Sequence, residues 1–397
     1  MKKTIFLIII IILIFGVNPR DSFSQSGHEH HDHSFHSDAN KKFYLHGGVK
    51  LHFDSIVEAH EKKEEVDEAS THSHLELGYN LNKNFSIFSD IKIEGESSGH
   101  THGGSTTTKD PEDKFFEDHK LFVNELVLNF FTDSNINLYL GKFSPSVGFD
   151  YHIFPGMYGY QKIEEYAITE RLGYGLMLNQ NFGDFGTHKL NVSTFFKDTT
   201  PLSNSIINDR GKTKKSDGGV SNTQDFSSYA ISLEGKNFFS LTNNFIDGFS
   251  YKIGHAKQAK SVKHLGSNAA NVSLTNDEKR SSFSLAHTSL ITSNLRMKII
   301  AEYMNIEHYT GEELHDRAYM TTGMDLLYKK INIGGTYTQE TNEAAEEDEA
   351  IDDKVYQVSL GYLFNKNLRA DIGYKKADEE NEIKHTVGAL ITYYLDF

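Results

Sequence analysis

From residue 42 to residue 397, apolar and polar side chains alternate along the chain in about sixteen separate segments. The last segment, residues 384–397, shows the pattern clearly, with Val387, Ile391 and Tyr393 on one parity and Thr386 and Thr392 on the other. Successive residues of a β-strand point to opposite faces of the sheet. Each segment therefore predicts a strand with one apolar face and one polar face, and the whole pattern predicts an all-β protein.

The connections between these segments narrow the fold further. We expect strands near residues 42–53, 75–81, 85–93, 120–131, 136–144, 172–178, 190–196, 229–233, 249–254, 283–285, 295–303, 318–328, 331–337, 356–364, 368–374 and 384–397. Short turns and long polar loops alternate strictly between them, which is typical of short periplasmic turns and long external loops. The prediction is a transmembrane antiparallel up-and-down β-barrel of about 16 strands, closed by pairing of segment 384–397 with segment 42–53.

The composition agrees with a barrel whose interior is wet. The chain has 28 Phe, 20 Tyr and 31 Gly but only 5 Pro, and its formal net charge is -15. Its mean hydropathy is negative, as expected when half of each strand faces water inside the barrel. The sequence contains no Cys, so disulfides and thiolate metal sites are removed from consideration.

The N-terminus carries the features of an export signal. Lys2 and Lys3 precede an apolar run at residues 4–17, and Ser22 and Ser24 supply small residues for cleavage. We predict a signal peptide at residues 1–24, a His-rich polar segment at residues 25–41 and the barrel at residues 42–397. The expected location is the outer membrane of a Gram-negative bacterium, and the expected partners there are outer-membrane lipid and the barrel assembly machinery.

One block of the sequence, together with the C-terminal Phe397, resembles a known family. Residues 141–151 read GKFSPSVGFDY, residues 154–159 read FPGMYG and residues 169–175 read TERLGYG. The block resembles the proteobacterial, Gram-negative outer-membrane general porins. The resemblance implies a water-filled channel for small solutes and ions, and a third loop that folds into the lumen and forms its constriction. General porins commonly form trimers, so the resemblance also implies that a homotrimer is one expected assembly.

The resemblance makes the loop at residues 145–167 the candidate constriction. Its carboxylates are Asp150, Glu164 and Glu165, and they are expected to oppose basic residues across an eyelet. The basic residues are Lys142, Arg171, Arg296, Lys298 and Arg369. Opposed charges of this kind select solutes by size and charge. The alternative is an external loop with no gating role.

Parity also places charges of both signs inside the barrel. The other basic residues on the inward faces are Lys50, Lys92, Lys189, Lys197, Lys252 and Lys375, and the acidic ones are Glu76, Asp90, Glu94, Glu302, Asp325 and Asp371. A charge on the lipid face would cost about 2–4 kcal/mol at mid-membrane. These residues therefore indicate a lumen that contains water.

Histidine is the other unusual feature. The candidate metal ligands are His28, His30, His31, His33 and His36 in the N-terminal segment, and His72, His74, His100 and His102 in two short motifs that we expect on external loops one and two. Imidazole and carboxylate together suit zinc and similar divalent metals. Since no spacing defines a closed tetrahedral site, the sequence predicts weak, multivalent zinc binding and no required cofactor. The alternative is a polar leader that only happens to be His-rich.

Several functions remain open on the sequence alone. The preferred interpretation is a diffusion channel that also assists divalent metal uptake, with a periplasmic His-rich segment as the sink. The alternatives are a non-conducting adhesin or structural barrel and a metal-binding surface protein. An enzyme is not predicted, because there is no G-x-S-x-G motif and His287 and Ser289 lack an evident acidic partner. No nucleic-acid partner is expected.

Phe397 and Tyr393 lie on the apolar parity of the closing strand and are the candidate assembly residues. Deletion of Phe397 is expected to impair assembly in the outer membrane and to leave export unaffected, because the terminal strand is what the insertion machinery recognises in barrels of this kind. The measurement is the fraction of protein that folds into the outer membrane, compared with the fraction that reaches the periplasm. Assembly at the parental level after the deletion would contradict the barrel-closing role.

Overall fold

The computed structural model describes residues 41–95, 112–132, 134–236, 248–263, 272–273, 276–343, 352–379 and 382–396. The predicted signal peptide, His28, His30, His31, His33 and His36, the motif His100 and His102, and Phe397 lie outside these residues. None of the helices in the described part is long and apolar enough to cross a membrane.

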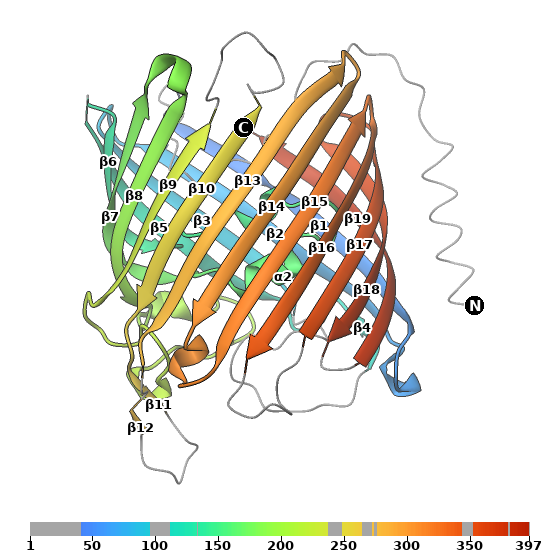
Figure 1. Cartoon of the computed structure of the whole chain (residues 1–397), viewed down its shortest axis with the longest axis horizontal. Helices are drawn as coiled ribbons and strands as arrows, with labels where there is room; N and C mark the ends of the chain where they lie inside the picture. Colours follow the sequence, from blue (N-terminus) through green and yellow to red (C-terminus); the bar gives the residue numbers. More distant parts are fainter. Residues whose placement is uncertain are drawn as a thin grey trace.

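Within the described residues, sixteen antiparallel strands form one closed barrel (Figure 1). They are β1 (Phe43–Glu58), β2 (Asp67–Asn80), β3 (Phe85–Glu94), β5 (Lys120–Phe131), β6 (Ile136–Phe143), β7 (Arg171–Asn181), β8 (Thr187–Lys197), β9 (Ser228–Lys236), β10 (Phe249–Gln258), β13 (Glu278–Thr292), β14 (Leu295–Glu307), β15 (Asp316–Tyr328), β16 (Ile331–Glu343), β17 (Asp352–Leu363), β18 (Leu368–Glu379) and β19 (Glu382–Asp396). The predicted fold class is confirmed.

The remaining elements are short. They are β4 (Lys114–Phe115), β11 (Val262–Lys263), β12 (Val272–Ser273), α2 (Gln161–Glu165), η1 (Lys62–Glu64), η2 (Tyr151–Ile153), η3 (Gly183–Phe185), η4 (Pro201–Ser203), η5 (Lys215–Asp217) and η6 (Tyr309–Gly311). β4 adds a short parallel pairing to β2, and β11 pairs with β12 outside the barrel sheet. Of these elements, η2 and α2 matter most for function, because both belong to the connection between β6 and β7.

The barrel closes where the sequence predicted. β19 pairs antiparallel with β1, in a register that runs from His46 opposite Asp396 to Glu58 opposite His385 and places Tyr393 opposite Val49. Among the described residues, closure leaves the sixteen-strand ring without an edge strand, which a bilayer requires because lipid cannot hydrogen-bond unpaired backbone groups.

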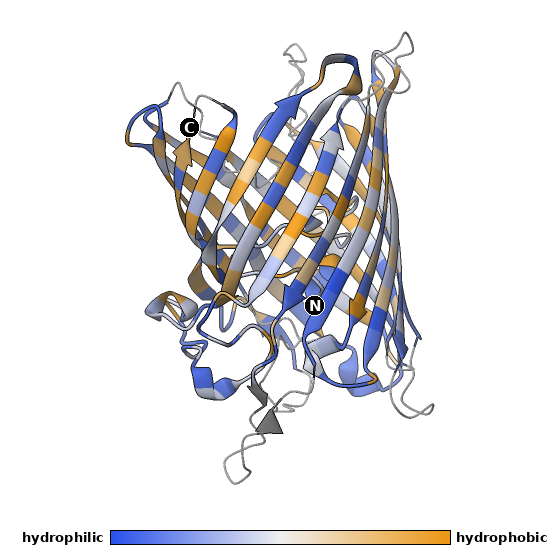
Figure 2. Cartoon of the chain, turned by 60° about the vertical axis from the view of Figure 1, so that its left-hand side comes forward, coloured by the Kyte–Doolittle hydropathy of each residue, from blue (hydrophilic) through white to orange (hydrophobic). Residues whose placement is uncertain are grey.

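The two faces of the wall differ as the alternation predicts. On β17, Tyr356, Val358, Leu360 and Tyr362 are exposed on the outer surface, whereas Ser359 is buried on the inner side. Figure 2 shows the same alternation of hydrophobic and hydrophilic residues along many strands. An apolar outer belt around a closed barrel, with Tyr at both ends of the belt on β17, is the arrangement of an outer-membrane barrel, and it confirms the predicted location.

Two predicted connections differ in the structure. Most of the expected loop at residues 376–383 belongs to strands, because β18 continues to Glu379 and β19 starts at Glu382. Conversely, β9 ends at Lys236 and β10 starts at Phe249, so twelve residues lie between these strand ends where a short turn was expected. The predicted strict alternation is therefore wrong at these two places. Hydrophobic alternation ends where a strand leaves the apolar belt, although the hydrogen-bonded ladder continues into charged sequence.

The outer belt gives a stability prediction. Val358 lies between Tyr356 and Tyr362 on the outer face of β17, so Val358→Lys places an ammonium against lipid and is expected to destabilise the folded barrel by about 2–4 kcal/mol. Equilibrium unfolding from lipid vesicles in denaturant measures this change. Val358→Leu keeps the face apolar and serves as the control; equal stability of the Lys and Leu variants would contradict the lipid-facing assignment.

Candidate functional site

Loop three, defined here as residues 144–170 between β6 and β7, crosses the inside of the barrel. The carbonyl of Pro155 accepts hydrogen bonds from Thr336 Oγ1 on β16 and from Gln357 Nε2 on β17, each at 2.6 Å. Around the ring, β6 and β7 are the fifth and sixth strands and β16 and β17 are the thirteenth and fourteenth. Loop three therefore reaches from one wall to the opposite wall, and α2 lies inside the ring of strands (Figure 1).

Local sequence features shape this path. Asp150 caps η2 by accepting a hydrogen bond from the backbone N–H of His152 at 2.9 Å. Gly156 has a φ of +86°, and a Cβ added there would lie 2.2 Å from the side-chain amide of Gln357. Glycine adopts this φ without strain, and a larger residue would also displace the Gln357 amide that donates to Pro155. The Pro-Gly sequence at residues 155–156 thus allows the backbone of loop three to touch β17.

One side of loop three is apolar and packs against the wall. The loop residues in this cluster are Val147, Tyr151, Phe154, Ile163, Tyr166 and Ile168, and their wall partners include Phe88, Val127, Tyr139, Phe143, Met177, Phe195, Ile300, Met304, Ile306 and Tyr319. These wall residues lie on β3, β5 to β8, β14 and β15. Burial of these apolar side chains favours a position of loop three inside the barrel over a position outside it.

Glu302 on β14 fastens both halves of loop three. Its carboxylate accepts hydrogen bonds from the backbone N–H of Phe149 at 2.6 Å, from Ser284 Oγ at 2.6 Å and from Tyr166 Oη at 2.8 Å. Glu302 is only 1 % exposed. A buried carboxylate is tolerable when several donors satisfy it, so Glu302 acts as an anchor and not as a free lumen charge.

The other side of loop three carries charged side chains. Lys162 Nζ on α2 lies 3.1 Å from Glu165, 3.4 Å from Glu340, 3.7 Å from Asp353 and 2.6 Å from Glu379. Burial lowers the pKa of Lys162, but these carboxylates outweigh it and raise the pKa. Burial raises the pKa of Glu165 to about 7, against the opposing effect of Lys162. Lys162 therefore ties α2 to β16, β17 and β18 through charge.

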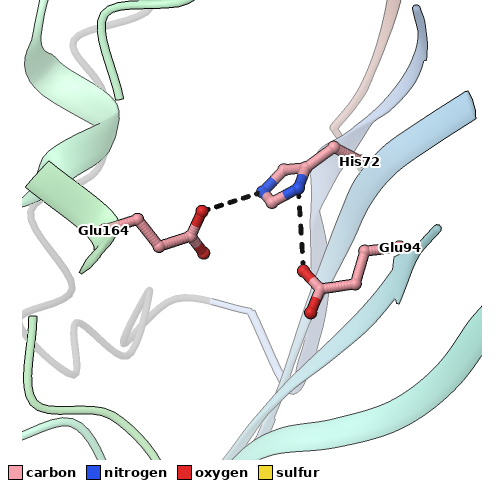
Figure 3. A group of neighbouring side chains, drawn as sticks. All are labelled: His72, Glu94 and Glu164. Atoms are coloured by element: carbon pink, nitrogen blue, oxygen red, sulfur yellow. Dashed lines mark ion pairs between the residues drawn. The ribbon is translucent and has the colours of Figure 1, made fainter. Parts of the chain in front are cut away.

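Glu164, on the same helix, faces the wall formed by β2 and β3. Lys92 Nζ lies 3.1 Å from Glu164 Oε1 and donates a hydrogen bond to Tyr151 Oη at 2.6 Å. Beside this pair, His72 Nδ1 lies 3.6 Å from Glu94 Oε2 and His72 Nε2 lies 4.0 Å from Glu164 Oε2 (Figure 3). His72, Glu94 and Glu164 form the group of possible metal ligands found among the described residues.

The histidine motif at residues 72–74 is not on an external loop, which corrects the prediction. His72 and His74 belong to β2, because the strand begins at Asp67 inside the expected charged loop. His74 Nδ1 lies 3.8 Å from Asp90 Oδ1, and its ring stacks on that of His152 with centroids 4.9 Å apart. Both histidines of the motif therefore contact the lumen side of the wall and loop three.

The predicted constriction residues Asp150, Lys298 and Arg369 each contact different groups. His152 Nδ1 lies 2.9 Å from Asp150 Oδ1, and Lys298 Nζ donates to the Ile153 carbonyl at 2.8 Å. Arg369 lies 2.6 Å from Asp371 Oδ1.

Of three further basic residues of the prediction, Arg171 and Lys142 bind other partners, and Arg296 is located by its strand. Arg171 donates to Gln258 Oε1 at 2.9 Å, whereas Lys142 lies 2.6 Å from Glu170 and 3.3 Å from Asp198. Arg296 is on β14, in register with Leu327. Arg171 and Lys142 thus bind partners other than Asp150, Glu164 and Glu165, contrary to the expected opposition for Arg171.

Sequence reasoning missed several residues that position loop three. Lys162, Thr336 and Gln357 were not singled out, since nothing in their spacing shows what they meet across a lumen. Tyr158 Oη donates to Asp54 Oδ1 at 2.5 Å and links loop three to β1. The one available signal was the inward parity of Thr336 and Gln357, which placed both on the face that loop three would touch.

Neither a family model nor a curated protein matches the sequence. Solved structures do match. OprB of Pseudomonas putida at high pH has a TM-score of 0.59 and 10% identity, covering 89% of this chain and 94% of that chain. The outer-membrane channel DcaP of Acinetobacter baumannii has a TM-score of 0.53 and 12% identity over 91% and 99%.

OmpF of Salmonella typhi, in complex with daunomycin, has a TM-score of 0.52 and 11% identity over 89% of this chain and 97% of that chain. Identities this low bear on the fold alone. The predicted resemblance is confirmed at that level: over about nine-tenths of its length, this chain has the fold of the Gram-negative outer-membrane porins.

Proposed function

We propose that the protein forms a water-filled outer-membrane channel for passive diffusion of small hydrophilic solutes and ions. The observation that carries the proposal is the path of loop three, which crosses the lumen and is hydrogen-bonded through Pro155 to the opposite wall. A barrel of sixteen strands leaves an aqueous interior, and a loop held across it narrows the path. The fold shared with solved outer-membrane porins supports a channel over an enzyme.

We place the passage on the ionic side of loop three. Its apolar side packs toward β5 to β8, β14 and β15, whereas its charged side chains meet β2 and β3 and β16 to β18. Water and ions favour the charged side, because desolvating them against apolar atoms is costly. Glu164, Glu165 and Arg369 are the proposed constriction residues on this side, and we add Asp150 and Lys298 at the η2 end of loop three, where Lys298 of β14 binds the Ile153 carbonyl.

The other residues of the expected constriction take supporting roles in this proposal. Lys142 and Arg171 hold the end of loop three through Glu170 and Gln258, and Arg296 contributes positive charge to the wall. We retain a homotrimer as part of the proposal. We also propose that the histidines assist zinc uptake, with the segment at residues 25–41 as the periplasmic sink.

A non-conducting adhesin or structural barrel is the competing function. The observation that favours it is the number of links between loop three and the wall, which include Glu302, Lys162 and Tyr158. A loop fixed this firmly could close the lumen instead of narrowing it. The two functions differ in one measurable property, the ionic current.

Reconstitution in a planar bilayer tests the channel directly. The purified protein is expected to give steady, discrete current steps, because a hydrated lumen conducts ions under a voltage. Reversal potentials in a salt gradient then give the ion selectivity. Silence from protein that is shown to be inserted and folded would favour the adhesin.

Removal of the Lys162 ammonium tests the role of loop three. Lys162→Met leaves Glu340, Asp353 and Glu379 without their shared cation, which costs up to about 3–5 kcal/mol, and it frees α2 from the wall. We expect larger current fluctuations and altered conductance in single-channel records.

Lys189→Met is the matched control for this variant. Lys189 pairs with Glu234 at 3.1 Å between β8 and β9, two strands of the wall. Quiet, parental currents from Lys162→Met, or equal noise from both variants, would argue against loop three as the constriction.

A further inference from the structure

His72, Glu94 and Glu164 come together from three elements. His72 on β2 and Glu94 on β3 are direct partners in the antiparallel register, so the ladder fixes their separation. Glu164 comes from α2 of loop three and closes the group from the lumen side (Figure 3). Two of the three side chains therefore belong to the wall and one belongs to the constricting loop.

The donor set has the chemistry of a borderline-soft divalent cation. One imidazole nitrogen and two carboxylate oxygens are ligands that zinc accepts at roughly 2.0–2.2 Å, which places neighbouring donors roughly 3–4 Å apart. The 3.6 Å and 4.0 Å separations join opposite ring nitrogens of His72 to Glu94 and to Glu164, so an ion bound to one nitrogen requires the carboxylate on the other side to shift toward it. All three donor atoms lie within 4.8 Å of one another, and three protein ligands leave one position for water.

The surroundings hold these ligands in place. Lys92 binds Oε1 of Glu164 at 3.1 Å, while Oε2 is the oxygen that faces His72. His72 Nε2 is buried and has no hydrogen-bond partner, which leaves it suited to coordinate a metal. Lys92 and Lys50 are the ammonium groups that act on Glu164 and His72, and the two carboxylates balance them when His72 is neutral. Outer-shell contacts of this kind orient metal ligands.

We propose that His72, Glu94 and Glu164 form a binding site for a divalent transition metal of the zinc class inside the lumen. A bound ion cross-links α2 of loop three to β2 and β3. The effect on current rests on the proposed channel function: an ion at this point adds positive charge to the passage and immobilises the constricting loop, so it lowers the conductance.

The test uses the full chain with zinc chloride as the only probe. The five tail residues His28, His30, His31, His33 and His36 are replaced by Asn in the parent, so that the tail does not mask the lumen site. Calorimetry in detergent measures zinc binding, and bilayer recording measures current in chelator and then in zinc. We expect one site per chain, a reversible fall in conductance, and no comparable effect of magnesium, which prefers six oxygen ligands.

Variants locate the site. His72→Gln and Glu164→Gln are each expected to weaken zinc binding by at least about tenfold, because loss of even an outer-shell contact costs that much, and to abolish the block. His385→Gln, on the lipid-facing parity of β19 where its Nδ1 pairs with Tyr374 Oη, should bind zinc like the parent. The far-UV circular dichroism of the variants in chelator shows that their barrels are assembled, whatever their conductance.

The outcomes separate this site from the channel proposal. Zinc binding that is unchanged by both His72→Gln and Glu164→Gln would overturn the site, as would zinc-insensitive steady currents. Zinc binding that depends on His72 in a barrel that never conducts would leave the metal site standing and refute the channel.

Discussion

Closure of the backbone ladder between β1 and β19 is the constraint on which the rest of the structure depends. Lipid offers no hydrogen bonds, so every strand needs a partner on both sides. Sixteen strands meet this demand only as a ring, and a ring of this size encloses more space than its own wall side chains fill. The wide lumen then requires either water or an inserted segment. In this protein a long connection, loop three, enters the lumen.

Loop three divides the interior by polarity. Its apolar residues extend a core that includes the inner faces of β5 to β8, β14 and β15, while Lys162 pairs with carboxylates of β16 to β18 and Glu164 with Lys92 on β3. The barrel therefore has a protein-like core on one side and an ionic surface on the other. This arrangement explains why both charged and large apolar residues occur at inward positions, notably Phe143, Phe195 and Ile300.

Sequence patterns reached the strands, the facing of most of them and the closing pair, because each depends on local alternation that one segment displays by itself. Segments 120–131 and 136–144 carry apolar residues on both parities, so their facing stayed open. The patterns failed where partners come from distant segments. The four carboxylates around Lys162 arrive from α2, β16, β17 and β18, and no spacing in the chain encodes that meeting. His72 and His74 were misplaced for a different reason. β2 continues beyond the apolar belt into charged residues, where alternation no longer marks a strand.

The ionic contacts of loop three mainly fix its position and add little to the free energy of folding. A buried ion pair gains little over well-packed apolar residues, yet removal of one partner is costly. Lys162, Lys92 and Glu302 each hold a different point of loop three, on different strands of the wall. A loop held only by its apolar cluster could shift within that core. Charges with fixed partners exclude such shifts, and the width of the passage beside α2 is set by where those partners lie.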